Sequence, residues 1–115
     1  MIEKIVIDYL HEELDVPVKA EVPADYAGGE LCVIELLGAS RDNRLPGAVV
    51  AVQSYADSLL GAADLSDRVT EAMLAITALD SVSWCGLNSA YNFTDETTGR
   101  YRYQAIFEIN WYKAR

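Results

Sequence analysis

The sequence has few of the residues that metal binding and catalysis usually require. Its 115 residues include one histidine, two cysteines and three prolines. No apolar run approaches the roughly 20 residues that a membrane span needs. Basic residues are also scarce, because 9 lysines and arginines stand against 18 aspartates and glutamates, which gives a net charge of −9. This charge argues against general affinity for nucleic acid or for a membrane of anionic lipid, since both need a basic surface.

The scarcity of histidine and cysteine limits the catalytic and metal-binding groups that the chain could form. His11 has no second histidine at the spacing of a zinc helix, so we expect a plain surface residue. Cys32 and Cys85 form no Cys-x-x-Cys pair and lie in apolar segments, which predicts two reduced, buried thiols. The sequence also lacks a Gly-x-Ser-x-Gly turn and a phosphate-binding Gly-x-x-x-x-Gly-Lys loop. We therefore predict no enzymatic activity, no cofactor and no metal.

Carboxylates are plentiful, and one of them interrupts an apolar run. Glu35 lies within the run 31–37, where a buried carboxylate could have a raised pKa and a function. The simpler interpretation places it on an exposed strand face or pairs it with Arg41 or Arg44.

The length of the chain and its N-terminal sequence give expectations for the number of domains and for the cellular location. A chain of 115 residues fits one domain, which we take as residues 1–115. The start of the chain shows no basic segment followed by an apolar stretch, so no signal peptide and no secretion are expected. This predicts a protein that assembles in the cytoplasm.

Hydrophobic periodicity predicts two helices and five strands. Helical spacing of apolar residues marks the two helices, and alternation or short apolar runs mark the strands. Asp57 or Ser58 is a candidate cap for the second helix, and Pro17 favours an edge position for the first strand. The predicted elements are a helix at 2–14, strands at 16–22, 31–37 and 48–55, a helix from about 59 to 79, and strands at 82–93 and 100–112, with a polar connection at 38–47. The fold class is α+β, a mostly antiparallel sheet of about five strands with two helices packed on one face, in the order α-β-β-β-α-β-β.

The last two strands hold a concentration of aromatic residues. Residues 101, 103, 105, 107, 109 and 111 are apolar or aromatic and share one face, and a turn at 94–99 joins the two strands. Cross-strand packing within the sheet explains such residues. A subunit interface explains them equally well, because tyrosine, tryptophan and arginine are enriched there. The strands also exceed the ordinary length of about 5–6 residues, which suggests that the turn reaches beyond the core.

Several segments together resemble the tail-terminator (tail-completion) minor tail proteins of long-tailed bacteriophages and prophages. These segments are Val49-Val50-Ala51-Val52-Gln53-Ser54-Tyr55-Ala56, Leu87-Asn88-Ser89-Ala90-Tyr91-Asn92-Phe93-Thr94-Asp95 and Gly99-Arg100-Tyr101-Arg102-Tyr103-Gln104-Ala105-Ile106-Phe107. The N-terminal helix followed by Val16-Pro17-Val18, and the arginine-bearing loop 38–47, also fit this family. The likeness spans most of the chain and rests on the order of the segments, because none of them is a catalytic motif.

The resemblance implies a structural virion protein of the tail. Such a protein forms a ring, typically a hexamer, at the head-proximal end of the tail tube, where it stops tube growth and offers a surface to the head–tail connector protein. Its partners would be further copies of itself, the tail tube protein and the connector, with no specific nucleic acid and no membrane. The candidate contact residues are Arg41, Asp42, Asn43, Arg44, Tyr91, Asp95, Glu96, Arg100 and Arg102.

Two other classes of function remain open at this point. The first is a small-molecule-binding or chaperone-like α+β sandwich, a dimer whose sheet face forms a pocket with Tyr101, Tyr103 and Trp111. The second is an enzyme that uses carboxylates alone, which would require a cleft with an acid pair of perturbed pKa. Neighbouring genes for major tail, tape-measure and portal proteins would favour the virion protein.

Overall fold

The computed structural model describes residues 1–42 and 45–112 of the chain. The described elements follow the predicted order of helix, three strands, helix and two strands, with a short 3-10 helix added after the second helix. They are α1 (Ile2–Leu14), β1 (Val18–Lys19), β2 (Leu31–Asp42), β3 (Leu45–Ala56), α2 (Leu59–Leu74), η1 (Ile76–Ala78), β4 (Val82–Asn92) and β5 (Tyr101–Trp111).

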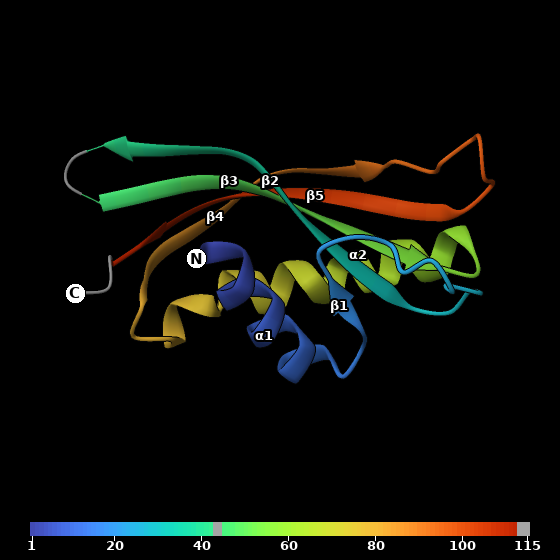
Figure 1. The fold of residues 1–115 in the computed structure, drawn as a ribbon, viewed down its shortest axis with the longest axis horizontal. Coiled ribbons are helices and arrows are strands. Elements are labelled where there is room, and N and C mark those ends of the chain that lie inside the picture. Colours follow the sequence, from blue (N-terminus) through green and yellow to red (C-terminus); the bar gives the residue numbers. More distant parts are fainter. Residues whose placement is uncertain (43–44, 113–115) are drawn as a thin grey trace.

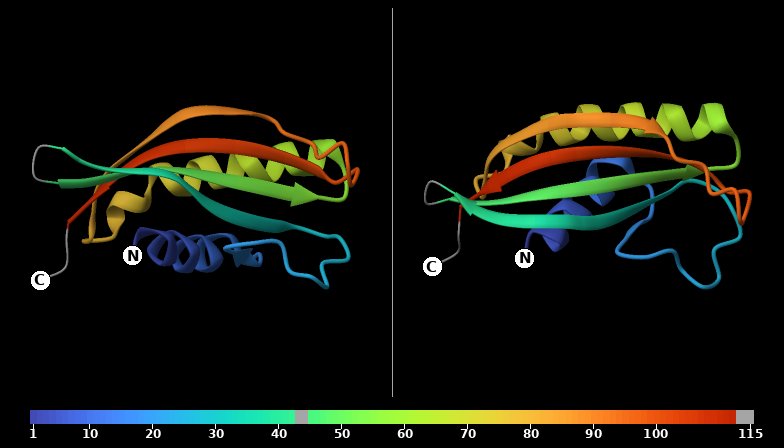
Figure 2. Two further views of the ribbon diagram at one scale, coloured as in Figure 1. Left: turned by 45° about the horizontal axis from the view of Figure 1, so that its top comes forward. Right: turned by 90° about the horizontal axis from the view of Figure 1, so that it is seen from above.

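The five strands form one sheet in the order β1-β2-β3-β5-β4. β1 is parallel to β2, and all other neighbours are antiparallel. Both helices lie on the same side of this sheet, and the opposite face carries no helix (Figures 1 and 2). The predicted fold class is therefore confirmed. The molecule is elongated along the strands, with extents of 42 × 25 × 23 Å.

α1 forms where the sequence predicts it. Ile2, Val6 and Leu10 recur at helical spacing and are buried against the sheet. The helix ends because Asp15 adopts a left-handed conformation with φ 54°, and its N–H donates to the carbonyl of His11 at 3.1 Å.

α2 is shorter than predicted. Ser58 is its cap, and the Ser58 hydroxyl accepts a hydrogen bond from the N–H of Gly61 at 3.0 Å. The helix ends at Leu74 rather than near residue 79, so its 16 residues span about 24 Å. The chain tightens into η1, which keeps Ile76 fully buried in the core.

The strand boundaries correct two sequence-based predictions. The predicted loop 38–47 consists mostly of strand, because β2 and β3 remain paired as far as Asp42 and Leu45. The loop was predicted there because glycine and proline usually interrupt strands. Gly38 follows a bulge in β2, and Pro46 pairs only with β2, since the pairing of β3 with β5 begins at Gly47. The first strand is also much shorter than the predicted 16–22 and makes just two residue pairs with β2.

The main core lies between the helices and the sheet. Phe107, Val50 and Val52 from the central strands meet Leu65 and Val69 of α2, and all five are fully buried. Near one end of the sheet, a smaller cluster packs on the opposite face and consists of Leu31, Val33 and Tyr55, with Val22 and Tyr26 against it. The sheet is thus covered by helices on one side and by part of the loop before β2 on the other.

Both cysteines are free and buried, as predicted. Burial raises the pKa of the Cys32 thiol from 9.0 to about 12 and that of the Cys85 thiol to about 11. The folded chain therefore holds these two protons more tightly than the unfolded chain does. The resulting stabilisation is present below pH 9 and is lost as the pH rises towards the folded-state pKa values.

We expect the free energy of unfolding to fall as the pH rises from about 9 to about 11, because unfolding then releases thiol protons. Urea unfolding at a series of pH values measures this dependence. In Cys32→Ala, the decline should be less steep than in the unmodified chain. An equal slope in both proteins would show that Cys32 makes no contribution.

Candidate interaction surface

The structure separates the predicted contact residues into two groups at opposite ends of the sheet. Arg41 and Asp42 belong to the end of β2, where they pair with the start of β3. Asp95 and Arg100 form an isolated bridge at the far end of the β4–β5 hairpin (Figure 1). The predicted contacts at residues 43–44 lie outside the described residues, and Arg41 and Asp42 are described as strand backbone alone. The described members of the predicted set therefore lie at two ends of the sheet, and the surface that they would form stays a prediction.

The turn at 94–99 is held by the carboxylate of Asp95. Its oxygens accept hydrogen bonds from the Thr98 hydroxyl at 2.9 Å, from the Thr97 N–H at 3.0 Å and from the Thr98 N–H at 3.4 Å. The Thr98 hydroxyl bond is the largest cause that lowers the pKa of Asp95 below its ordinary value. Gly99 adopts φ 73°, a conformation that side chains rarely allow. Asp95 thus shapes the turn, whereas Glu96 is exposed at its tip.

Arg102 links three strands on the face without helices. Its Nε donates to the Phe93 carbonyl at 2.6 Å, and its Nη1 donates to the Tyr55 hydroxyl at 3.0 Å. The guanidinium also lies 4.4 Å from the centroid of the Phe93 ring. Two of the five guanidinium N–H donors are therefore already used within the chain, and these bonds fix the orientation of the side chain.

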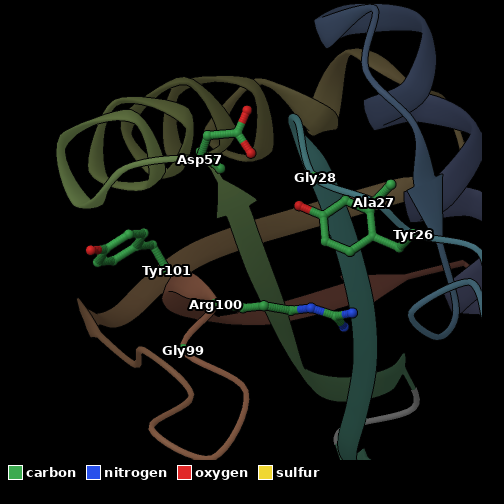
Figure 3. Close-up of a pocket in the computed structure, with 8 residues that line it drawn as sticks. Tyr26, Ala27, Gly28, Asp57, Gly99, Arg100 and Tyr101 are labelled. Carbon is green, nitrogen blue, oxygen red and sulfur yellow. The ribbon is translucent and has the colours of Figure 1, made fainter.

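Arg100 lies beside a pocket that the sequence did not reveal. Its guanidinium is 5.1 Å from the centroid of the Tyr26 ring, in a cation–π contact. Figure 3 shows Arg100 extending toward Tyr26, whereas Tyr101 points to the other side. The pocket has a volume of about 310 Å³ and is lined by Tyr26, Ala27, Gly28, Ala56, Asp57, Gly99, Arg100 and Tyr101.

The loop that forms the wall of this pocket is tightly held. The Tyr26 hydroxyl donates to the carbonyl of Gly29 at 2.6 Å, and the N–H of Gly29 donates to Asp57 Oδ1 at 2.9 Å. Gly28 has φ 120°, and a Cβ placed there would lie 2.8 Å from Asp57 Oδ1. The sequence signal for this arrangement was only a tyrosine beside two glycines, because the partners come from distant segments.

A polar row crosses four strands on the face without helices. Gln53 Nε2 donates to Glu35 Oε1 at 3.0 Å and to Gln104 Oε1 at 2.9 Å. Gln104 Nε2 in turn donates to the Tyr91 hydroxyl at 2.6 Å. The two glutamines are only 8% and 7% exposed, although no helix lies above them. The simpler interpretation of Glu35 is confirmed, since this residue is exposed and bonded to Gln53.

The outer surface of the helix layer carries a group of carboxylates. Exposed carboxylates on its outer surface come from α1 and α2: Asp8, Glu12, Glu13, Asp64, Asp67 and Glu71. Among the described residues, no group of three or more histidines, cysteines and carboxylates could hold a metal ion. Within residues 1–42 and 45–112, no helix is both long and apolar enough to span a bilayer.

The described residues thus form a two-layer α+β fold whose second sheet face carries a polar row and no helix (Figure 2). No protein-family model matches the chain, and no curated protein matches it. Among solved structures, its fold is similar to that of a chain in the virion of a native gene transfer agent particle. The two share 15% sequence identity with a TM-score of 0.68, over 96% of this chain and 93% of that chain. At this identity the likeness concerns the fold.

Proposed function

We propose that this chain is a structural protein of a phage-like virion. In this proposal it caps the head-proximal end of the tail tube as a ring, ends tube growth and joins the tail to the head. It works through protein–protein contacts and has no catalytic role. The observation that carries the proposal is the fold likeness to a chain of a gene transfer agent virion, which extends over nearly the full length of both chains.

Two features of the chain support the proposal. The three longest segments that resemble the tail-terminator family lie mainly in β3, β4 and β5, which form the centre and one edge of the sheet. The outer surface of the helix layer is acidic, and the chain has a net charge of −9. An acidic surface facing a lumen would repel a passing polyanion, so the genome could move through a ring without being bound.

Light scattering over a wide range of protein and salt concentrations tests the proposal first. We expect a closed oligomer of about six subunits, visible as rings in negative stain, because a heterologous interface closes into a ring when its rotation permits. If the protein is a monomer, purified tail tubes should be added and their ends imaged for capping. A stable dimer that leaves tube ends uncapped would contradict the proposal.

Charge reversal at Arg41 and Arg44 tests the predicted contact segment 41–44. The double variant Arg41→Glu, Arg44→Glu should weaken assembly while the monomer stays folded, since the two arginines would pair with carboxylates of a neighbouring subunit or of the tube protein. Oligomer mass and circular dichroism measure the two effects separately. Unfolding of the variant would instead make these arginines structural.

The pocket in Figure 3 favours a second candidate function, a small-molecule-binding protein. Arg100 and Asp57 place a cation and an anion in one concave site of about 310 Å³. The predicted trio of Tyr101, Tyr103 and Trp111 does not describe this site, because Trp111 packs against the main core. A dimer that retains a bound small molecule through purification would support this alternative.

A further inference from the structure

β4 is an edge strand whose sequence carries no charge and no proline that would block pairing with another strand. The segment 82–94 contains no charged residue and no proline. Natural edge strands usually carry lysine, proline or inward-pointing charges that prevent association. Two bulges interrupt β4, but its pairing with β5 is regular from Trp84 to Leu87. Trp84 and Leu87 are 50% and 43% exposed.

The opposite edge of the sheet is also largely free. β1 pairs only with Cys32 and Val33 of β2. The remainder of β2, from Ile34 to Asp42, has no partner strand on that side within the part of the chain that the structure describes. Two exposed leucines lie on this free part, with Leu36 at 37% and Leu37 at 47% exposure.

The exposed leucines of the two free edges, β4 and the free part of β2, lie at the same position along the strand direction. In the register of the sheet, Leu36 pairs with Val50, which pairs with Phe107, which pairs with Leu87. Leu36 on one edge and Leu87 on the other therefore occupy the same row across the sheet. Each edge exposes apolar side chains at the same height along the strands.

The directions of the strands also match. β2, β3, β5 and β4 alternate in direction, so β4 runs opposite to β2. A second copy placed beside β4 in the same orientation would present its β2 antiparallel to β4. The sheet can thus continue from copy to copy through a head-to-tail contact, the kind of contact that closes into a ring when a rotation between neighbours permits.

A groove beside β2 provides a place for a side chain of the neighbouring copy. It has a volume of about 410 Å³, lies between α1 and the middle of β2, and includes Ile7, Ile34 and Leu36 in its lining. Leu87 pairs with Phe107, whose side chain points into the core, so Leu87 projects on the helix side of the sheet as this groove does.

We infer that β4 of one copy pairs antiparallel with the free part of β2 in the next copy, and that Leu87 enters the groove beside α1. The inference rests on the proposed ring, and it names the surfaces that would build it. Backbone hydrogen bonds supply the pairing, and the apolar side chains of both edges set its register.

Disulfide trapping between two copies tests the inference. A chain with Glu35→Cys in β2 is mixed with a size-tagged chain carrying Asn88→Cys in β4, under mild oxidation. Glu35 pairs with Ala51, Ala51 with Ile106 and Ile106 with Ser89, so residue 35 shares its row with the bulge at residues 88–89. Residues 35 and 88 are exposed, whereas the two natural thiols are buried. The matched control replaces Glu35→Cys with Glu71→Cys, which is exposed on α2. We expect a mixed disulfide several-fold more abundant than in the control.

A second variant disrupts the edge without a disulfide. Leu87→Glu should abolish the oligomer and leave the circular dichroism spectrum unchanged, because a carboxylate would enter a groove whose lining already includes Glu3, Asp8 and Glu35. Its control, Leu60→Glu, changes a leucine that is 83% exposed on α2 and should assemble normally.

The possible outcomes separate the inference from the proposed function. A ring without the 35–88 disulfide, or a ring that survives Leu87→Glu, overturns the inference and leaves the ring function standing. A disulfide formed only between two copies of Asn88→Cys indicates a symmetric edge pairing and also overturns it. A chain that forms neither oligomer nor disulfide, and that caps no tube, overturns both.

Discussion

Replacing Phe107 with alanine should lower the free energy of unfolding by about 3–5 kcal/mol, the largest effect that we expect from a single substitution. Phe107 is fully buried in β5, which pairs with both β3 and β4. The substitution removes a large apolar side chain from the interface between the sheet and α2 and leaves a cavity that the surrounding strands cannot fill.

Chemical denaturation measures this loss, and Leu60→Ala is the control. Leu60 is 83% exposed on α2, so its truncation should change stability by less than about 0.5 kcal/mol. A comparable loss in both variants would mean that Phe107 is no more important to the core than a surface leucine.

Replacing Gln53 with leucine should cost about 1–3 kcal/mol, because it leaves a buried acceptor without its donor. Gln53 Nε2 donates to both Glu35 and Gln104, and Gln104 is only 7% exposed. Glu35 is exposed and can turn to water, whereas Gln104 Oε1 loses its partner in a site that water reaches poorly.

The double variant Gln53→Leu, Gln104→Leu shows whether the two residues act together. Replacing both partners removes the unsatisfied acceptor, so the combined loss should be smaller than the sum of the two single losses. Urea unfolding of the four proteins gives the coupling energy. Strictly additive losses would show that the bond between the two amides makes no net contribution.

These two predictions concern opposite faces of the same sheet. The helix side is a conventional apolar core, whereas the other side places two nearly buried glutamines in a hydrogen-bonded row beneath no helix. Such a row keeps the strands in register and leaves a polar, ordered surface. In the proposed ring, this surface and the two free edges are the parts of the sheet that remain for partners.

The sequence by itself determined the elements whose signals are local. The spacing of Ile2, Val6 and Leu10 predicted α1, and the alternation in 101–111 predicted β5. Of its predicted apolar face, residues 105, 107 and 109 are buried, whereas Tyr101 is exposed. Element order and fold class followed, because a helix stripe and a strand face must each bury their apolar side against another layer.

The tertiary structure alone decided where each strand ends and which polar groups meet. Gly38 and Pro46 read as loop residues, yet a bulge and a position paired to one neighbour accommodate them within strands. Gln53 meets Gln104 across 51 residues of sequence, and Arg100 meets Tyr26 across a still longer stretch of the chain. No local pattern in the sequence extends over such separations. Periodicity records which face of an element is buried, but the partner on that face depends on strand order, which is set by the packing of the whole sheet.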